Sequence, residues 1–140
     1  MFGTVGAFSP SFRVAGDRSS AAAVQRSRLA LRMVERGPVR RNLRIWLSAG
    51  TGEETADRDH DGVIDAVGDV EDLVNGWRDP DGHVHRGLRQ LGDDVVAGGP
   101  HDPPRAGAVA LEVVPGARHD QRAWAAVLPD FLRWAFPPSH

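Results

Sequence analysis

The most constraining stretch of this sequence is an apolar run near its end, Ala108–Val114, in which β-branched valine recurs. Such a short run is typical of a buried strand. Pro115 and Gly116 follow it and end the strand, because proline removes a backbone donor and glycine permits unusual φ angles. A helix is expected from about Asp120 or Gln121. The end of the chain is therefore a strand followed closely by a helix.

His119 lies in the short loop between this strand and this helix. A histidine held between two rigid elements has the fixed geometry that a general base requires. Loops also carry many polar residues that have no catalytic role, so a surface histidine is the alternative interpretation.

Two earlier stretches, Thr4–Phe8 and residues 43–47, also predict buried strands. Helices are expected over residues 20–36 and 68–77, where apolar residues recur at helical spacing. Strands that alternate with helices predict an α/β fold with about three parallel strands and flanking helices. The simplest interpretation of four arginines in the first helix places them on its solvated side: Arg26, Arg28, Arg32 and Arg36.

Residues 78–105 are predicted to form a loop-rich insertion with a short helix near residues 86–91. The final helix contains Pro129, which is expected to kink it or to begin a second segment. Its apolar stripe is expected to comprise Trp124, Val127, Leu128, Phe131, Leu132 and Ala135.

The composition excludes several classes of protein. A chain of 140 residues with 41% hydrophobic residues fits one domain with a core, and a net charge of −2 gives no basis for a nucleic-acid partner. The absence of cysteine excludes disulfides and a thiol nucleophile. No apolar run approaches membrane-spanning length and no signal peptide is evident, so we expect no membrane partner and a cytoplasmic location.

An acidic segment beginning at Asp57 matches the first nine positions of an EF-hand-type calcium loop. Carboxylates at alternating positions converge on a hard cation, and Gly62 allows the sharp turn. The twelfth position is Gly68, where a bidentate glutamate is expected, so a self-capped acidic turn is the alternative. The expected ligands for Ca²⁺ are Asp57, Asp59, Asp61 and Asp65.

His83 and His85, close to Asp79 and Asp81, form a second candidate metal pair. No third ligand at a supporting spacing is evident.

A glycine-rich turn, residues 48–53, follows the second strand and ends at Glu53. Open α/β sheets place functional groups at the carboxyl ends of their strands. Glu53 is therefore a candidate acid, and Glu54 competes with it.

Three segments resemble the esterase family of α/β-hydrolases that contains enterochelin-esterase-like, feruloyl-esterase-like and mycolyltransferase-like proteins. His119-Asp120 and Trp124, followed by residues 128–132, look like the family's H-[DE]-x-x-x-W…L-x-x-[FL]-L segment. Residues 43–53 look like its strand and G-T-x-[DE] turn, and residues 2–11 look like its F-x-x-v-x-x-x-S-P stretch.

The resemblance implies an α/β-hydrolase fold in which His119 is the general base and Glu53 its orienting acid. The reaction would be hydrolysis of a small-molecule carboxylic ester through an acyl-serine, with no cofactor. The order of acid before histidine agrees with this class of enzyme.

The chain departs from the family pattern at the nucleophile, because the G-x-S-x-G elbow is missing. Ser9 and Ser11 flank Pro10, and Ser48 follows the bulky Trp46 at two residues' distance, so none of these serines fits an elbow. We therefore expect residues 1–140 to be the C-terminal portion of one esterase domain, inactive by itself and prone to self-associate through an exposed sheet edge. The alternative function is a small, non-catalytic calcium-binding module.

Overall fold

The computed structural model describes residues 3–97 and 108–138 and shows a mixed α/β fold. Four parallel strands form one sheet in the order β1-β2-β6-β5. The strands are β1 (Thr4–Phe8), β2 (Arg44–Gly50), β5 (Asp94–Ala97) and β6 (Ala108–Val114). The bounds of the expected strands Thr4–Phe8 and Ala108–Val114 are confirmed, but β1 is an edge strand and not a buried one, since Val5 is 42% exposed. The strand predicted over residues 43–47 begins and ends later, as β2.

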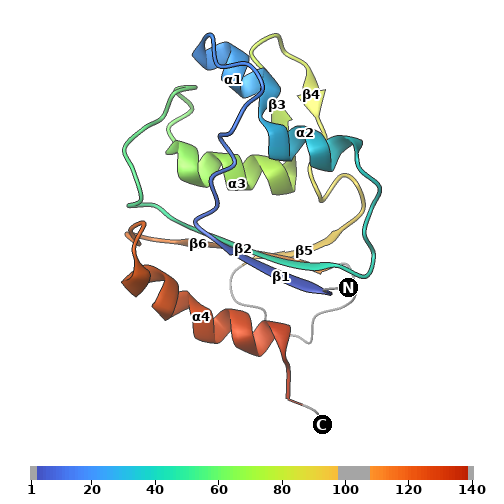
Figure 1. Cartoon of the computed structure of the whole chain (residues 1–140), viewed down its shortest axis with the longest axis vertical. Coiled ribbons are helices and arrows are strands. Elements are labelled where there is room, and N and C mark those ends of the chain that lie inside the picture. The colour runs from blue at the N-terminus through green and yellow to red at the C-terminus, as the bar shows by residue number, and fades with distance from the viewer. Residues whose placement is uncertain (1–2, 98–107, 139–140) are drawn as a thin grey trace.

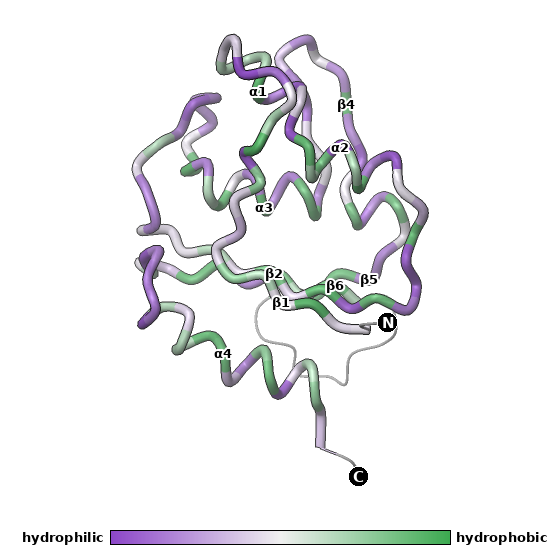
Figure 2. Tube along the Cα trace, in the orientation of Figure 1, coloured by the Kyte–Doolittle hydropathy of each residue, from purple (hydrophilic) through white to green (hydrophobic). Residues whose placement is uncertain are grey.

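Helices cover both faces of the sheet (Figure 1). On one face lie α1 (Ala21–Ser27), α2 (Leu29–Arg36) and α3 (Asp65–Asn75), and on the other lies α4 (Gln121–Ala135). Because successive residues of a strand point to opposite faces, β2 serves both layers: Leu47 packs toward α2 and α3, and Trp46 toward α4. Figure 2 shows the resulting concentration of hydrophobic residues along the sheet.

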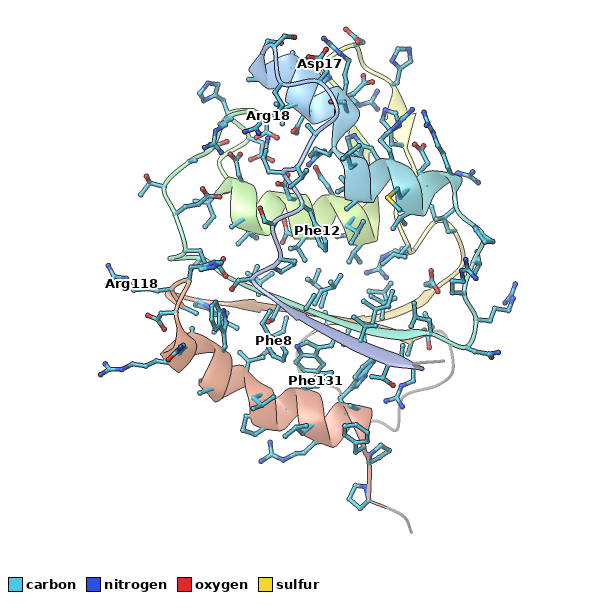
Figure 3. All side chains as sticks on the ribbon, in the orientation of Figure 1. Phe8, Phe12, Asp17, Arg18, Arg118 and Phe131 are labelled. Carbon is cyan, nitrogen blue, oxygen red and sulfur yellow. The ribbon has the colours of Figure 1, made fainter. Side chains whose placement is uncertain are left out.

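The α4 layer is held by aromatic contacts. Phe131 meets Phe8 edge-on at 5.5 Å between ring centroids, and Trp46 meets Trp134 at 5.7 Å; Figure 3 shows Phe8 and Phe131 facing each other between β1 and α4. Gly6 permits this approach, since a Cβ there would lie 2.8 Å from the Phe131 ring. The packing explains why α4 is pressed against the β1–β2 side of the sheet.

Two expectations for α4 need correction. Pro129 does not begin a second segment, because the helix runs continuously from Gln121 to Ala135. Of the expected stripe, Val127 and Ala135 are buried and Phe131 packs beside them, but Leu128 and Leu132 are 42% and 44% exposed, and Trp134 joins the buried face. The helix is therefore rotated relative to the expected stripe, and the aromatic contacts decide its orientation.

The predicted helix over residues 20–36 is two helices that meet at Arg28, whose φ of −56° and ψ of 115° are not helical. Arg28 is also buried, with 1% exposure, so its assignment to a solvated face was wrong. The break turns this side chain inward, onto α3.

Arg28 is paired with two carboxylates of α3. Its guanidinium lies 2.6 Å from Asp69 and 2.8 Å from Asp72, and it stacks over the Trp77 ring. Burial raises the pKa of Asp69, and raises that of Asp72 to about 6, although Arg28 opposes both shifts. A second arginine, Arg13, binds Asp69 at 3.1 Å. This charge network joins α1, α2 and α3 above the sheet.

The segment predicted to be loop-rich contains strands that the sequence did not reveal. A hairpin is formed by β3 (Trp77–Arg78) and β4 (Val84–His85), and β5 pairs in parallel with β6. Trp77 therefore lies in a strand and not in the helix predicted over residues 68–77, which runs from Asp65 to Asn75 as α3. The sheet therefore has four strands where about three were expected. Residues 86–91 form turns and no helix, and residues 98–107 lie outside the described part of the chain.

Replacing Arg28 by methionine tests the importance of the buried network. Arg28→Met is expected to lower the free energy of unfolding by about 3–5 kcal/mol, because Asp72 loses its cation and the buried Asp69 keeps only Arg13. Urea unfolding followed by circular dichroism measures the change. Arg26→Met, at a side chain that is 41% exposed, is the matched control, with an expected change below about 1 kcal/mol. Equal losses for the two variants would show that the buried ion pairs contribute no more to stability than an exposed one.

Candidate functional site

The candidate residues lie at one edge of the sheet. Parallel strands place their carboxyl ends together, and the ends of β1, β2 and β6 lead into Ser9, the turn that bears Glu53, and the loop that bears His119. β2 pairs with β6 from Ile45↔Val109 to Gly50↔Val114. This register fixes how the turn of Glu53 lies relative to the loop of His119. Residues 66 positions apart in the sequence thereby become neighbours.

The turn after β2 and the loop after β6 are joined by hydrogen bonds. The Gly52 N–H donates to the Ala117 carbonyl at 2.9 Å, and the Gly116 N–H donates to the Thr51 hydroxyl at 2.7 Å. Gly50 makes this approach possible, since a Cβ there would lie 2.1 Å from the Ala117 carbonyl oxygen. The glycines of this turn therefore serve close backbone contact.

Glu53 is almost fully buried, with 4% of its side chain exposed. Its Oε1 accepts hydrogen bonds from the Gly50 N–H and from the Ser9 hydroxyl, both at 2.6 Å. Its Oε2 lies 3.3 Å from Nδ1 of His119, whose side chain is 56% exposed. A carboxylate facing Nδ1 favours the tautomer with the proton on that nitrogen, which leaves the lone pair on Nε2.

Glu53, and not its competitor Glu54, meets His119. A cavity of about 190 Å³ opens beside the pair, and both glutamates line it together with Ser11 and Arg13. A small organic group can thus reach the exposed imidazole from this side.

Sequence reasoning missed the way in which Ser9 and Trp124 join this site. Trp124 donates its indole N–H to the Ser9 hydroxyl at 2.9 Å, and its ring lies edge-on to His119 at 5.2 Å between centroids. The sequence pattern places Trp124 in an apolar helix stripe and in the histidine-bearing segment, and it places Ser9 in the segment over residues 2–11 as a serine that fits no elbow. One sequence feature could have placed Ser9 at this site. Ser9 follows the carboxyl end of a predicted strand, as Glu53 and His119 do.

The serines do not complete a nucleophile–base pair. Within residues 3–97 and 108–138, the His119 ring has one hydrogen-bond partner, Glu53. Ser9 directs its hydroxyl to that carboxylate and away from the histidine. Ser48 is buried within β2.

The acidic loop before α3 brings three of its four expected ligands together. Oxygen atoms of Asp57, Asp59 and Asp61 lie within 4.8 Å of one another, and Figure 2 shows this loop as strongly hydrophilic. Asp57 also accepts the N–H groups of Asp61 and Gly62, at 3.1 and 3.0 Å. Burial alone would raise the pKa of Asp57, but these donors lower it overall.

The fourth expected ligand, Asp65, does not join this cluster. It is buried at the start of α3 and forms ion pairs with Arg13, at 2.7 Å, and with Arg58. Gly68, at the position of the bidentate glutamate, lies inside α3 and has no side chain. The neighbouring Asp69 is held by Arg13 and Arg28. Stabilisation of α3 therefore uses two carboxylates that a calcium loop would need.

The histidine pair of the β3–β4 hairpin is divided between two environments. His85 stacks on Trp77 at 4.4 Å between centroids and contacts Glu35 at 3.1 Å and Asp79 at 3.2 Å. His83 is 74% exposed and also lies 3.2 Å from Asp79. Asp79 further accepts backbone N–H groups of the turn. The expectation that a third ligand was lacking was wrong in one respect, because ligand atoms of Asp79, Asp81 and His83 lie within 4.8 Å of one another, whereas His85 is not part of this group.

Comparison of the chain with protein-family models, curated proteins and solved structures found no match. Among the described residues, the helices are too short or too polar to cross a membrane.

The close approach at Gly50 predicts a local defect on substitution. Gly50→Ala is expected to lower the free energy of unfolding by about 1–3 kcal/mol, because its methyl group overlaps the Ala117 carbonyl. The displaced loop should also separate His119 from Glu53, which NMR spectra of the His119 ring would detect. Gly68→Ala is the control. Gly68 lies inside α3, and a Cβ there would be 4.0 Å from its nearest neighbour, a side-chain atom of Val63, so the free energy of unfolding should rise by up to about 1 kcal/mol. Unchanged NMR spectra of the His119 ring in Gly50→Ala would show that the close contact between Gly50 and Ala117 is not needed to hold His119 beside Glu53.

Proposed function

We propose that this chain carries the acid and the base of a serine-type esterase site, with Glu53 and His119 in these roles. One observation carries the proposal: a buried carboxylate lies 3.3 Å from Nδ1 of a half-exposed histidine at the carboxyl edge of a parallel sheet. The same two residues are the ones that the esterase-like sequence segments designate. The substrate class is a small-molecule carboxylic ester, and the chemistry needs no cofactor.

In this mechanism Nε2 of His119 accepts the proton of a serine hydroxyl as the hydroxyl oxygen attacks the ester carbonyl. Glu53 keeps the imidazole in the required tautomer and stabilises the imidazolium that forms. His119 then returns the proton to the leaving alcohol, and water removes the acyl group by the same route.

The serine itself is the part that this sequence does not provide, because no G-x-S-x-G elbow occurs in it. The proposal therefore assigns this chain the C-terminal portion of a hydrolase domain. By itself the chain should form no acyl-serine. Its histidine should retain only the intrinsic reactivity of an oriented imidazole toward activated esters.

That residual reactivity is measurable with 4-nitrophenyl acetate, which imidazole attacks directly. His119→Gln is expected to lower the rate of 4-nitrophenolate release by about tenfold, since His119 is the oriented base. Glu53→Gln should lower it by a smaller factor, because the carboxylate acts only through the imidazole. A fluorophosphonate probe should leave the serines unlabelled.

His83→Gln is the matched control, since His83 is also exposed and also lies beside a carboxylate, Asp79 at 3.2 Å. It should leave the rate within about twofold of the wild-type value. The proposal fails if His119→Gln and His83→Gln have the same effect.

A calcium-binding module is the second candidate function. The observation that favours it is the convergence of Asp57, Asp59 and Asp61, with oxygen atoms within 4.8 Å of one another. Burial raises the pKa of Asp59, and the neighbouring charge of Asp61 adds to the shift, so a cation between them would relieve repulsion. With no glutamate at the twelfth position, only weak binding is expected.

Isothermal titration calorimetry with CaCl₂ tests this candidate. A module should bind Ca²⁺ with Kd of about 10⁻⁴–10⁻³ M, the range of weak extracellular sites. Asp61→Ala should abolish the heat, and Glu54→Gln, outside the cluster, should preserve it. Absence of heat from the wild-type chain would leave a self-capped turn and remove this candidate.

A further inference from the structure

The described residues contain a continuous set of hydrogen bonds that leads from α4 to the Glu53–His119 pair. Trp124 donates to the Ser9 hydroxyl at 2.9 Å, Ser9 donates to Oε1 of Glu53 at 2.6 Å, and Oε2 of Glu53 faces His119 at 3.3 Å. These four residues come from the ends of β1, β2 and β6 and from α4. The set therefore joins every strand end that surrounds the site.

The direction of each bond follows from the chemistry of the groups. An indole N–H can only donate, so the Ser9 oxygen is its acceptor. The hydroxyl has one proton, and at 2.6 Å from Oε1 that proton points to the carboxylate. Ser9 consequently acts as a donor toward Glu53 and cannot give its proton to His119 in this arrangement.

The backbone also fixes Ser9 in place. Its N–H donates to the Ser48 carbonyl of β2 at 2.8 Å, and its φ is +51°. A non-glycine residue in this left-handed region costs free energy, and such residues persist where the surrounding structure determines their conformation. The strained turn aims the hydroxyl at Glu53.

Trp124 holds the site at two points. Its N–H sets the orientation of the Ser9 hydroxyl, and its ring packs at 82° to the His119 ring with 5.2 Å between centroids. Because His119 is half exposed, this ring contact restricts an imidazole that Glu53 alone would hold loosely.

We propose that Ser9 and Trp124 are positioning residues that orient the Glu53 carboxylate and the His119 ring for proton transfer. With Oε1 occupied by the Ser9 hydroxyl and the Gly50 N–H, Oε2 is directed to Nδ1 of His119. This inference rests on the proposed function, since orientation matters for a base in a reaction. It assigns Ser9 a supporting role and no role as the nucleophile.

The test is the tautomer of His119 in the whole chain, measured by long-range ¹H–¹⁵N NMR spectra with ¹⁵N-labelled histidine. His119→Gln assigns the signals. The wild type should hold the proton on Nδ1. Ser9→Gly removes the hydroxyl and suits the positive φ, and the Nδ1–H to Nε2–H ratio should then fall by about threefold to tenfold, the factor for one net hydrogen bond.

Trp124→Phe keeps an aromatic ring but removes the indole donor, so it should change the ratio in the same direction, and it decides the matter if Ser9→Gly does not fold. Ser11→Gly is the matched control, because Ser11 lines the same cavity without a hydrogen bond to Glu53 among the described contacts, and the ratio should stay at the wild-type value. An unchanged or increased ratio in Ser9→Gly and Trp124→Phe would overturn the inference.

The tautomer measurement needs no ester hydrolysis, so the two proposals can fail separately. If the variants change the tautomer while His119→Gln leaves 4-nitrophenyl acetate hydrolysis unaltered, only the proposed function fails. If hydrolysis depends on His119 but the variants leave the tautomer unchanged, only the positioning role fails.

Discussion

The structure depends first on the parallel pairing of β2 with β6. These two strands lie at the centre of the sheet, and their side chains supply both hydrophobic layers. Because parallel strands end at one edge, the pairing also brings the turn after β2 against the loop after β6. Gly50 lets the two backbones touch at Ala117, and without that contact Glu53 and His119 would not meet.

A second constraint acts on the opposite side of the molecule from α4. Arg28, Asp69 and Asp72 form a buried charge network, and its members must remain paired because an isolated buried charge is costly. Asp65, paired with Arg13 and Arg58, extends this network to the acidic loop. Acidic residues that resemble metal ligands in sequence are thus divided between two uses, since Asp65 and Asp69 hold α3 and only Asp57, Asp59 and Asp61 remain together.

The candidate site shows how a rigid framework can orient an exposed histidine. Glu53 is buried and its Oε1 accepts two short hydrogen bonds, so its Oε2 has a defined direction toward His119. His119 is exposed on the side of the cavity and is bordered by Trp124 on another. This combination of a fixed acceptor and a half-exposed imidazole suits a general base, and it is the physical link between the fold and the proposed chemistry.

The sequence by itself determined the α/β class, the strands Thr4–Phe8 and Ala108–Val114, and the candidates Glu53 and His119, because strand runs and strand-end turns are local patterns. It did not reveal β5, whose four residues form a strand only through pairing with β6. It also misplaced Arg28 and Asp65, since a charged residue's burial depends on a partner far away in the chain. Tertiary structure alone decided that Ser9 and Trp124, 115 residues apart, share one hydrogen bond beside Glu53. The physical reason is that periodicity reports which face of an element is apolar, whereas contacts between distant elements depend on how those faces pack together.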